Sequence, residues 1–423
     1  MSVAGLSLES LLILPITLVA FLALLTLIVF IHEFGHFSVA RLLGVRVEVF
    51  SLGFGRTLAK WVDKAGTEWR ISLWPLGGYV KFYGDANPAS QASDEVASEK
   101  EGARPVTTQF PRPGEASAAG AGMTAEERAV CFHFKPVWAR ALIVAAGPVF
   151  NFILAIAIFT ALFMSVGRYE TAPVVGAVVA GSAAEQAGLA PGDTIVGVNG
   201  RSISKFRQLQ DAVLVSGGQT VELSVIRAGD RLTVPIAPQR VDMTDRYGNA
   251  VAMWQIGIQG DVSAYTFEKY GFAKALQASV HELWRVLSIT VRYIGRIVAG
   301  QEDASQLGGP IKMAQYAGQS VMSGFDESGY SEPPSFWTKL KVSLADFISL
   351  AAVVSISIGF LNLLPVPVLD GGHLVYYAYE AVAGKPLGVR AQAIGFRVGI
   401  VLLASLMIFV TWNDISNLIS SIS

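Results

Sequence analysis

Five consecutive residues at the end of the first apolar run have the types and spacing needed for metal-dependent hydrolysis. His32-Glu33-Phe34-Gly35-His36 separates two histidines by four positions, and on a helix such residues share one face. Both imidazoles could then hold one metal ion, with Glu33 beside them. A zinc ion held by two histidines and one carboxylate keeps a fourth position for water and lowers the pKa of that water to about 7. Glu33 could take the proton and later pass it to the leaving amine.

The alternative interpretation is that these polar residues only mark a helix end at a membrane interface. Two observations weigh against it. The chain has five histidines, and two of them lie in this pattern. Glu33 also follows a long apolar run, where an unpaired carboxylate is costly. The metal interpretation is therefore favoured.

A second motif, far along the chain, offers a third ligand. Residues 362–373 read Asn-Leu-Leu-Pro-Val-Pro-Val-Leu-Asp-Gly-Gly-His. Pro365 and Pro367 remove backbone donors, so we expect a helix to end there, and the two glycines after Asp370 are expected to allow a sharp turn. Asp370 would then stand on irregular backbone at the membrane edge, where only a cavity lined by protein would tolerate it. His373 is the competing ligand, although a capping or carbonyl-bonding role suits it better.

The overall composition places both motifs in a membrane protein. Hydrophobic residues make up 52% of the 423 residues and charged residues 15%, whereas a soluble globular chain carries about 25% charged residues. The mean hydropathy is +0.47. Lys and Arg number 32 against 33 Asp and Glu, so no basic excess indicates nucleic-acid binding. The single cysteine excludes an intramolecular disulfide framework and a cysteine-rich metal site.

Four apolar runs predict four transmembrane helices. The first run, Leu11 to Ile31, contains no charged residue, and at ~1.5 Å per residue it covers about 31 Å, the thickness of a bilayer core. The last run reaches this length only if Arg397 extends its side chain towards the interface. We expect the four helices at residues 8–36, 137–167, 344–373 and 391–415. The first carries the His-Glu motif, and the third carries the second motif.

The distribution of Lys and Arg predicts the orientation of these helices. Residues 1–10 and 413–423 contain neither, whereas residues 41–140 contain thirteen. Basic loops close to spans favour the cytoplasm, so we expect the loop after the first span to be cytoplasmic and both termini to lie outside. Residues 167–346 should lie outside as well, because long domains cross the membrane largely regardless of charge.

The segments between the spans differ in character. Residues 44–83 alternate apolar and polar side chains, which predicts strands. Because they directly follow a span, we expect a membrane-associated β region. Residues 87–128 are rich in Ala, Ser, Gly, Pro and charge, which predicts a flexible cytoplasmic loop. Residues 269–299 carry one apolar stripe in helical register and are expected to pack on a domain or lie at the bilayer interface.

Residues 173–262 have the pattern of a small domain dominated by strands. We expect a strand, a short helix and a second strand before the Asn-Gly turn at residues 199–200. A hairpin of residues 221–226 and 231–236 should follow. Ala187-Gly-Leu and Gly192-Asp-Thr-Ile-Val-Gly-Val-Asn-Gly200 resemble a PDZ domain, and the sequence shows one such copy.

The motifs in this order resemble the site-2 protease family, and within it the group of the bacterial regulator of sigma-E protease. The resemblance rests on the two motifs in separate spans and on the PDZ-like block between them. It extends to Gly77-Gly-Tyr-Val-Lys81, Trp138-Ala-Arg140 and Gly147-Pro148-x-x-Asn151. Nearly the whole chain is covered, apart from residues 87–128. The best-known members carry two tandem PDZ domains. Because this chain shows a single copy, the resemblance does not establish that it selects substrates by the arrangement found in those members.

The resemblance implies an intramembrane zinc endopeptidase that cuts single-span membrane proteins, such as anti-sigma factors or remnant signal peptides. The residues it implicates are His32, His36 and Asp370 as ligands of one Zn²⁺ ion, Glu33 as the catalytic acid/base, and Asn362, Pro365 and Pro367 as substrate-binding residues. It also implies a multi-pass protein of the bacterial cytoplasmic (inner) membrane. The PDZ domain would be periplasmic, and the active site would lie towards the cytoplasmic side.

Two other classes of protein could use similar residues. A transporter also places His, Glu and Asp within spans. The transporter hypothesis predicts internal repeats and additional spans, and the sequence shows neither. A catalytically inactive membrane scaffold that binds peptides through its PDZ domain has no need for Glu33. The expected fold is a polytopic α-helical membrane protein of about four transmembrane helices, with membrane-associated β-structure after the first helix and an inserted, mostly β PDZ domain. Nothing in the sequence indicates the oligomeric state.

Overall fold

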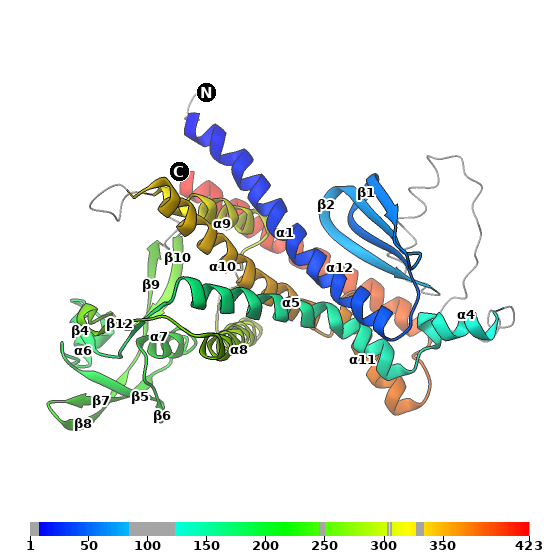
Figure 1. Ribbon diagram of the computed structural model, residues 1–423. Helices are drawn as coiled ribbons and strands as arrows, with labels where there is room; N and C mark the ends of the chain where they lie inside the picture. The colour runs from blue at the N-terminus through cyan, green and yellow to red at the C-terminus, as the bar shows by residue number, and fades with distance from the viewer. Residues whose placement is uncertain are drawn as a thin grey trace. The chain divides into compact units, whose positions relative to one another are not determined.

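The long apolar helices of the computed structural model match the apolar runs in number. The structure describes residues 8–83, 123–244, 250–302, 304, 307–326 and 334–422. Four of the described helices are long and apolar enough to cross a membrane (Figure 1). They are α1 (Leu8–Leu42), α5 (Val137–Ser165), α10 (Phe336–Asn362) and α12 (Val389–Ile422). The predicted number of apolar helices is therefore confirmed, and their orientation stays a prediction.

The second motif does not lie within α10. That helix ends at Asn362, and the motif continues through a compact loop into α11 (Asp370–Ala383), so the third span ends earlier than expected. The expectation of a sharp turn at Gly371 and Gly372 is wrong, because both lie in the first turn of α11. A Cβ added to Gly371 would lie 2.2 Å from the carbonyl oxygen of Leu364. Glycine is needed here because the loop packs against the helix, not because the chain turns.

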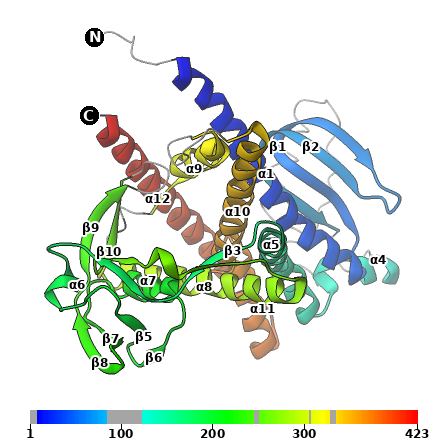
Figure 2. The ribbon, with the colours of Figure 1, turned by 60° about the vertical axis from the view of Figure 1, so that its left-hand side comes forward.

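A two-stranded antiparallel sheet follows α1, as the alternating pattern predicts. It consists of β1 (Val47–Val62) and β2 (Glu68–Phe82) and lies beside α1 in both views (Figures 1 and 2). Residues 49–52 pair with residues 78–81 and also with residues 68–71, so β2 bends around the start of β1. Several large apolar side chains of this sheet are exposed, among them Leu58, Trp61 and Trp74. Such exposure suits a lipid environment, and the membrane association of the sheet stays a prediction.

The flexible loop expected at residues 87–128 lies outside the described residues as far as residue 122. The rest of it begins a short helix, α4 (Ala125–Val130). Thr124 caps this helix: its hydroxyl accepts the backbone N–H of Glu127, and the Glu127 carboxylate accepts the backbone N–H of Thr124. The described end of the expected loop is therefore helical from residue 125.

A short helix that the sequence analysis did not anticipate, α9 (Pro310–Met322), contacts α1, α10 and α12. The carboxylate of Asp414 on α12 accepts hydrogen bonds from the backbone N–H groups of Gly309, Ile311 and Lys312 at 2.9–3.0 Å. A carboxylate at a helix N-terminus satisfies otherwise unpaired donors and interacts favourably with the helix dipole. These bonds explain why the last apolar helix tolerates a buried Asp.

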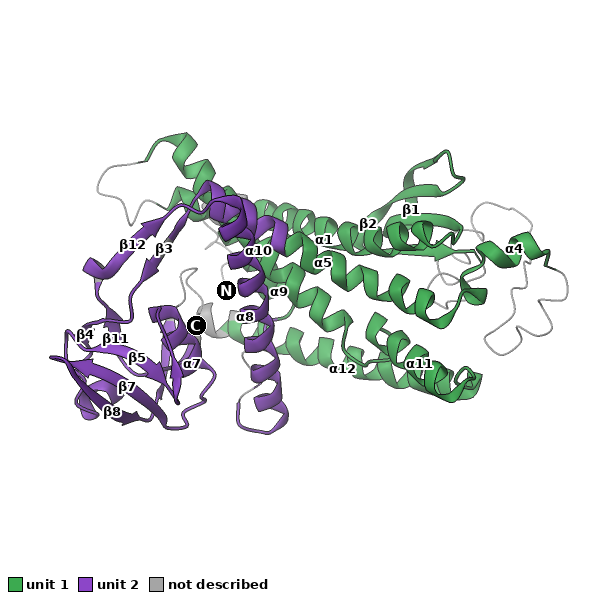
Figure 3. Cartoon of the chain, turned by 60° about the horizontal axis from the view of Figure 1, so that its bottom comes forward, with its two compact units in different colours: residues 1–155, 309–423 green, residues 156–308 purple. Residues whose placement is uncertain are grey.

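The chain divides into two units, residues 1–155 with 309–423 and residues 156–308 (Figure 3). The second unit contains the strand-rich block expected at residues 173–262 and helix α8 (Phe272–Val298). Its other elements are β3 (Arg168–Thr171), β4 (Val175–Val178), α6 (Ala183–Gln186), β5 (Thr194–Val198), β6 (Arg201–Ser202), α7 (Phe206–Leu214), β7 (Val221–Arg227), β8 (Asp230–Ile236), β9 (Gln239–Thr244), β10 (Ala250–Gln255), β11 (Ile258–Gly260) and β12 (Tyr265–Glu268).

The local predictions for this block are confirmed. β4, α6 and β5 form the expected strand, helix and strand, and β7 and β8 form the expected hairpin. Asn199 and Gly200 both have positive φ, at 48° and 74°, as a tight turn between strands requires. The strands enclose a core that includes Ile195, Leu209 and Leu223. The classification of this block as a PDZ domain stays a prediction.

The amphipathic pattern near residues 269–299 forms α8 (Phe272–Val298). Its buried Glu282 accepts hydrogen bonds from Arg207 of α7 at 2.7 Å and from Arg285 at 2.7 Å. Burial alone would raise the pKa of the Glu282 carboxyl, but the neighbouring arginines outweigh burial and hold that pKa below its usual value. α8 therefore packs on the strand-rich block, which is one of the two expected positions.

Candidate metal centre

Three potential metal ligands from the two motifs meet at one point. α1 supplies His32 and His36, and the first residue of α11 is Asp370. The Nε2 atoms of the two imidazoles lie 3.3 Å apart. Asp370 Oδ2 lies 3.1 Å from Nε2 of His32 and 3.5 Å from Nε2 of His36. In the described part of the chain, no other set of three or more His, Cys, Asp or Glu side chains converges in this way.

These separations are those expected for a tetrahedral zinc site. Ligand bonds of about 2.0–2.1 Å at tetrahedral angles place the ligand atoms about 3.3 Å apart, and the measured separations are 3.1, 3.3 and 3.5 Å. Asp370 Oδ2 is buried and accepts no hydrogen bond from the described residues, which is costly unless a cation is present. Two imidazoles and one carboxylate also form the ligand set of a catalytic zinc ion. The residues present therefore fit zinc.

The second nitrogen of each imidazole faces α5. His36 Nδ1 donates a hydrogen bond to the backbone carbonyl of Ile143 at 2.8 Å, which leaves Nε2 as the unprotonated nitrogen that a metal needs. His32 Nδ1 lies 3.2 Å from Asn151 Nδ2, while Asn151 Oδ1 is buried without a partner among the described residues. Rotating this amide by 180° brings Oδ1 to His32 Nδ1, where it accepts the ring N–H. We infer this amide orientation for the zinc-bound protein.

Two glycines allow α1 and α5 to approach closely at the metal centre. A Cβ added to Gly147 would lie 2.3 Å from His36 Nε2 and 2.8 Å from His32 Cε1. A Cβ added to Gly35 would lie 2.5 Å from the backbone oxygen of Ala146. Because real Cβ atoms do not approach this closely, a larger residue at either position would displace the imidazoles or separate the helices.

Asn151 is a site residue to which the sequence analysis assigned no role. The side chain is fully buried, and its backbone oxygen accepts a hydrogen bond from Ser355 Oγ of α10 at 2.9 Å. Asn151 thus connects α5 to α10 and to the metal-ligand helix α1. A signal was present in the sequence, because a lone amide in an apolar run needs a polar partner inside the membrane.

A buried ion pair anchors α11, the helix that begins with Asp370, to the start of α5. Arg140 Nη2 lies 2.6 Å from Glu380 Oε1, and the two side chains are only 10% and 17% exposed. Arg140 Nε also donates to the backbone oxygen of Lys135 at 3.0 Å, and its guanidinium lies 5.0 Å from the centre of the Tyr377 ring. The pair therefore fixes the helix that presents the third ligand.

Glu33 lies on α1 next to the cluster but does not belong to it. The group of converging ligand atoms contains His32, His36 and Asp370 and omits Glu33. The Glu33 side chain faces β2, where a Cβ added to Gly78 would lie 3.1 Å from Glu33 Cγ. This position fits a residue that acts on a water molecule beside the metal. The catalytic role of Glu33 stays a prediction.

The predicted substrate-binding residues have different surroundings. Asn362, the last residue of α10, places Nδ2 3.3 Å from His32 Nε2, so the structure brings it to the cluster. Pro365 and Pro367 lie in the loop between α10 and α11. Pro367 packs against α12, since a Cβ added to Gly395 would lie 3.5 Å from the proline ring. The binding roles of all three residues stay predictions.

Comparisons with known proteins agree with this geometry. A sequence model described as Peptidase family M50 matches residues 20–406. "Putative zinc metalloprotease Atu1380" of Agrobacterium fabrum is 42% identical over 404 residues, covering 95% of this chain and 96% of that protein. "Metalloprotease MmpA" of Caulobacter vibrioides is 39% identical over 403 residues, covering 95% and 96%. "Putative zinc metalloprotease RC0203" of Rickettsia conorii is 34% identical over 409 residues, covering 96% and 100%.

Proposed function

Because the chain belongs to peptidase family M50, the site-2 protease family, it is a zinc metalloprotease, and we propose that it cuts single-span proteins within the membrane. The observation that carries this proposal is the convergence of three zinc-compatible ligand atoms from the two motifs. Two of these atoms come from α1, one of the four helices long and apolar enough to span a bilayer. A zinc site on a membrane-spanning helix would hydrolyse peptide bonds that lie within the membrane.

Each residue of the centre has one role in the proposed reaction. His32, His36 and Asp370 hold the zinc ion, which supplies a Lewis acid that activates water and polarises the peptide carbonyl. Glu33 accepts the proton from the water and returns it to the amine of the leaving peptide. Its place beside the ligand group, but not within it, supports the role of base over that of ligand.

A helical substrate must unwind locally before it can be cut, because its carbonyl groups are bonded within its own helix. The freed groups then need new partners in a poorly hydrated site. β2 lies beside Glu33 at Gly78, so an extended substrate could pair with a strand edge there. The Asn362 amide, 3.3 Å from His32 Nε2, could form hydrogen bonds with the same unwound segment of the substrate. The loop that contains Pro365 and Pro367 would line the path of that segment.

The proposed setting follows from the family resemblance and from the charge distribution. The protein would lie in the bacterial cytoplasmic (inner) membrane, with the PDZ-like block in the periplasm and the metal centre towards the cytoplasm. The basic residues between positions 41 and 140 support this orientation. Anti-sigma factors and remnant signal peptides are the proposed substrates, since both offer a single apolar span.

Replacing Glu33 with Gln tests the proposal. The purified variant should keep about one zinc ion per chain, because its three ligands are unchanged. Cleavage of a single-span substrate in proteoliposomes should fall by several orders of magnitude, because a neutral amide cannot accept the proton. Asp370→Ala should instead lose both zinc and cleavage.

Glu222→Gln is the matched control, because this exposed glutamate lies in the other unit; it should keep zinc and cleavage. Cleavage by Glu33→Gln at nearly the wild-type rate would contradict the proposal. A wild-type protein that binds the single-span substrate and leaves it intact would indicate the inactive scaffold instead.

A further inference from the structure

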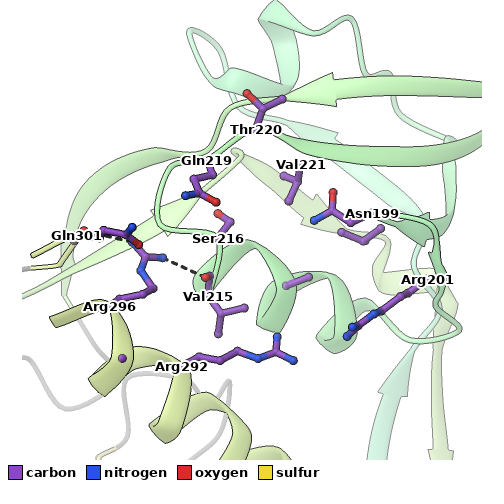
Figure 4. A pocket seen from close by; sticks show the side chains of 13 residues that line it. Asn199, Arg201, Val215, Ser216, Gln219, Thr220, Val221, Arg292, Arg296 and Gln301 are labelled. Carbon is purple, nitrogen blue, oxygen red and sulfur yellow. Dashed lines mark hydrogen bonds between the residues drawn. The ribbon is translucent and has the colours of Figure 1, made fainter. Parts of the chain in front are cut away.

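A cavity of about 530 Å³ lies in the second unit between β5, the C-terminal end of α7 and the last turns of α8 (Figure 4). Its lining includes three arginines, Arg201, Arg292 and Arg296, together with polar side chains such as Gln219 and Ser216. The described residues that line it include no carboxylate. The cavity is large enough for a small ligand or a lipid headgroup and is separate from the metal centre, whose residues lie in the first unit.

Two of the three arginines have unpaired charges. The side chains of Arg201 and Arg292 are exposed, and their guanidinium groups form no salt bridge or hydrogen bond with any described residue. Arg296 donates to the Glu302 carboxylate at 2.9 Å and to the backbone oxygen of Val215 at 3.0 Å, while its buried Nε has no partner in the described part of the chain. The bond to Val215 places the positive guanidinium at the C-terminal end of α7, where the helix dipole is negative. The cavity therefore keeps an excess of positive charge.

α8 itself lies at the end of a candidate span. The hydroxyl of Thr160, in the last turns of α5, donates to Ser279 of α8 at 3.1 Å, and the Phe163 ring lies 6.0 Å from that of Tyr270. α8 runs across these last turns of α5 in two views (Figures 2 and 3). If α5 spans the bilayer, a helix that crosses its end in this way runs along the membrane surface.

The side chains of α8 suit such a position. Trp284, Val291 and Val298 are 66%, 52% and 83% exposed and recur at seven-residue intervals on one face of the helix. Arg292 and Arg296 lie on another face, towards the cavity. An amphipathic helix with apolar residues on one side and basic residues on the other is typical of the interface with anionic lipids.

We infer that this cavity binds the phosphate of an anionic phospholipid. Guanidinium groups are suited to phosphate oxygens because their donors form paired hydrogen bonds to them. The exposed apolar face of α8 would contact the acyl chains of the same leaflet. This inference requires α5 to span a bilayer but does not require proteolysis, so it stands apart from the proposed function.

Short-chain lipids test the assignment with the full-length protein. Purified protein in detergent is mixed with dihexanoyl-phosphatidylglycerol, dihexanoyl-phosphatidylcholine or inorganic phosphate, and bound molecules are counted by native mass spectrometry. The wild type should retain phosphatidylglycerol in preference to phosphatidylcholine. The Arg201→Gln/Arg292→Gln variant should bind phosphatidylglycerol more weakly, on the order of tenfold.

Arg231→Gln/Arg240→Gln is the matched control, because it removes the same charge from exposed arginines that do not line the cavity. It should bind phosphatidylglycerol like the wild type, and thermal unfolding should show that both double variants are folded. Equal affinity of the wild type and the Arg201/Arg292 variant, or an equal loss in the control, would overturn the inference. Displacement of the lipid by an equal concentration of inorganic phosphate, or of a peptide with a free C-terminal carboxylate, would assign the cavity to that ligand and overturn the lipid assignment.

Discussion

Individual glycines determine whether the metal ligands can meet. Gly147 faces both imidazoles, with His36 Nε2 only 2.3 Å from the place a Cβ would occupy. Gly35 allows the backbone of α5 to approach α1, and Gly371 does the same for the loop that precedes Asp370. Zinc binding thus depends on the residues that lack side chains as well as on the three that carry ligand atoms.

Gly147→Ala should therefore impair zinc binding although it changes no ligand. The new methyl group would overlap the imidazole of His36, which must rotate away or push α1 from α5. We expect zinc content well below one per chain at limiting zinc, with a matching loss of cleavage. Metal analysis after dialysis against a weak chelator measures the effect.

The control for this substitution is Gly388→Ala in the same unit, where an added Cβ meets no atom within 4 Å and φ is not positive. It should leave the zinc content unchanged. A Gly147→Ala protein that binds zinc as tightly as the wild type would show that the helices separate at little cost.

Among the elements, α11 has the most direct effect on the chemistry, because its first residue is the third ligand. The loop before it contains Pro365 and Pro367, and its other five residues each donate a local backbone hydrogen bond. The Arg140–Glu380 pair, with an N–O distance of 2.6 Å, ties this helix to α5. A contact ten residues after Asp370 thus helps to set the position of that carboxylate.

Arg140→Ala should loosen α11 and weaken zinc binding. Removing one partner of a buried pair leaves the other charge uncompensated, which costs about 3–5 kcal/mol. We expect a lower unfolding temperature, together with faster loss of zinc to a chelator. Both can be measured on the detergent-solubilised protein.

The Arg140→Leu/Glu380→Leu double variant distinguishes two causes of a defect in Arg140→Ala. One is the lost attachment of α11 to α5, and the other is the unpaired charge left on buried Glu380. The double variant removes both charges, so most of the stability should return if the unpaired Glu380 causes the defect. A double variant as unstable as Arg140→Ala would instead show that the guanidinium contacts to Lys135 and Tyr377 hold the helix.

At the scale of the whole molecule, the strand-rich block is inserted between two apolar helices as part of a separate unit. The chain enters and leaves this block through a two-stranded ribbon in which β3 pairs with β12. Thr171 and Tyr265 are partners at the end of this ribbon. The two ends of the block therefore lie close enough to be joined by a short turn, although α8 would lose its contacts with α7.

Replacing residues 172–264 with an Asn-Gly turn tests what the block does. This turn type joins paired antiparallel strands, so Thr171 and Tyr265 should stay in register. We predict that the block excludes substrates that carry bulky outer domains. The shortened protein should cut a trimmed single-span substrate at the wild-type rate and should also cut a form with a folded outer domain, which the wild type rejects.

The zinc content of the shortened protein serves as its folding control, since the ligands all lie in the other unit. A protein that keeps zinc and cuts neither substrate would contradict exclusion. The block would then be a binding site for the substrate or a structural support for the catalytic unit.

Local patterns were sufficient to predict the apolar helices, α8 and several of the strands of this protein. The apolar runs, the His-Glu motif on α1, the strands after α1 and the β7–β8 hairpin each follow from residues close together in the chain. Hydrophobic periodicity and turn residues act over a few positions, so one sequence is enough to read them. The two metal motifs were recognisable for the same reason.

The tertiary structure alone decided how these elements meet. It placed Asp370 on a helix instead of a turn, brought Asn151 to His32 and paired Arg140 with Glu380. It also gathered three arginines around a cavity. Each of these arrangements joins residues far apart in the chain, and each depends on close packing between elements, which no local pattern records. The identity of the ligands could therefore be proposed from the sequence, whereas the separations of 3.1–3.5 Å that make them a zinc site could not.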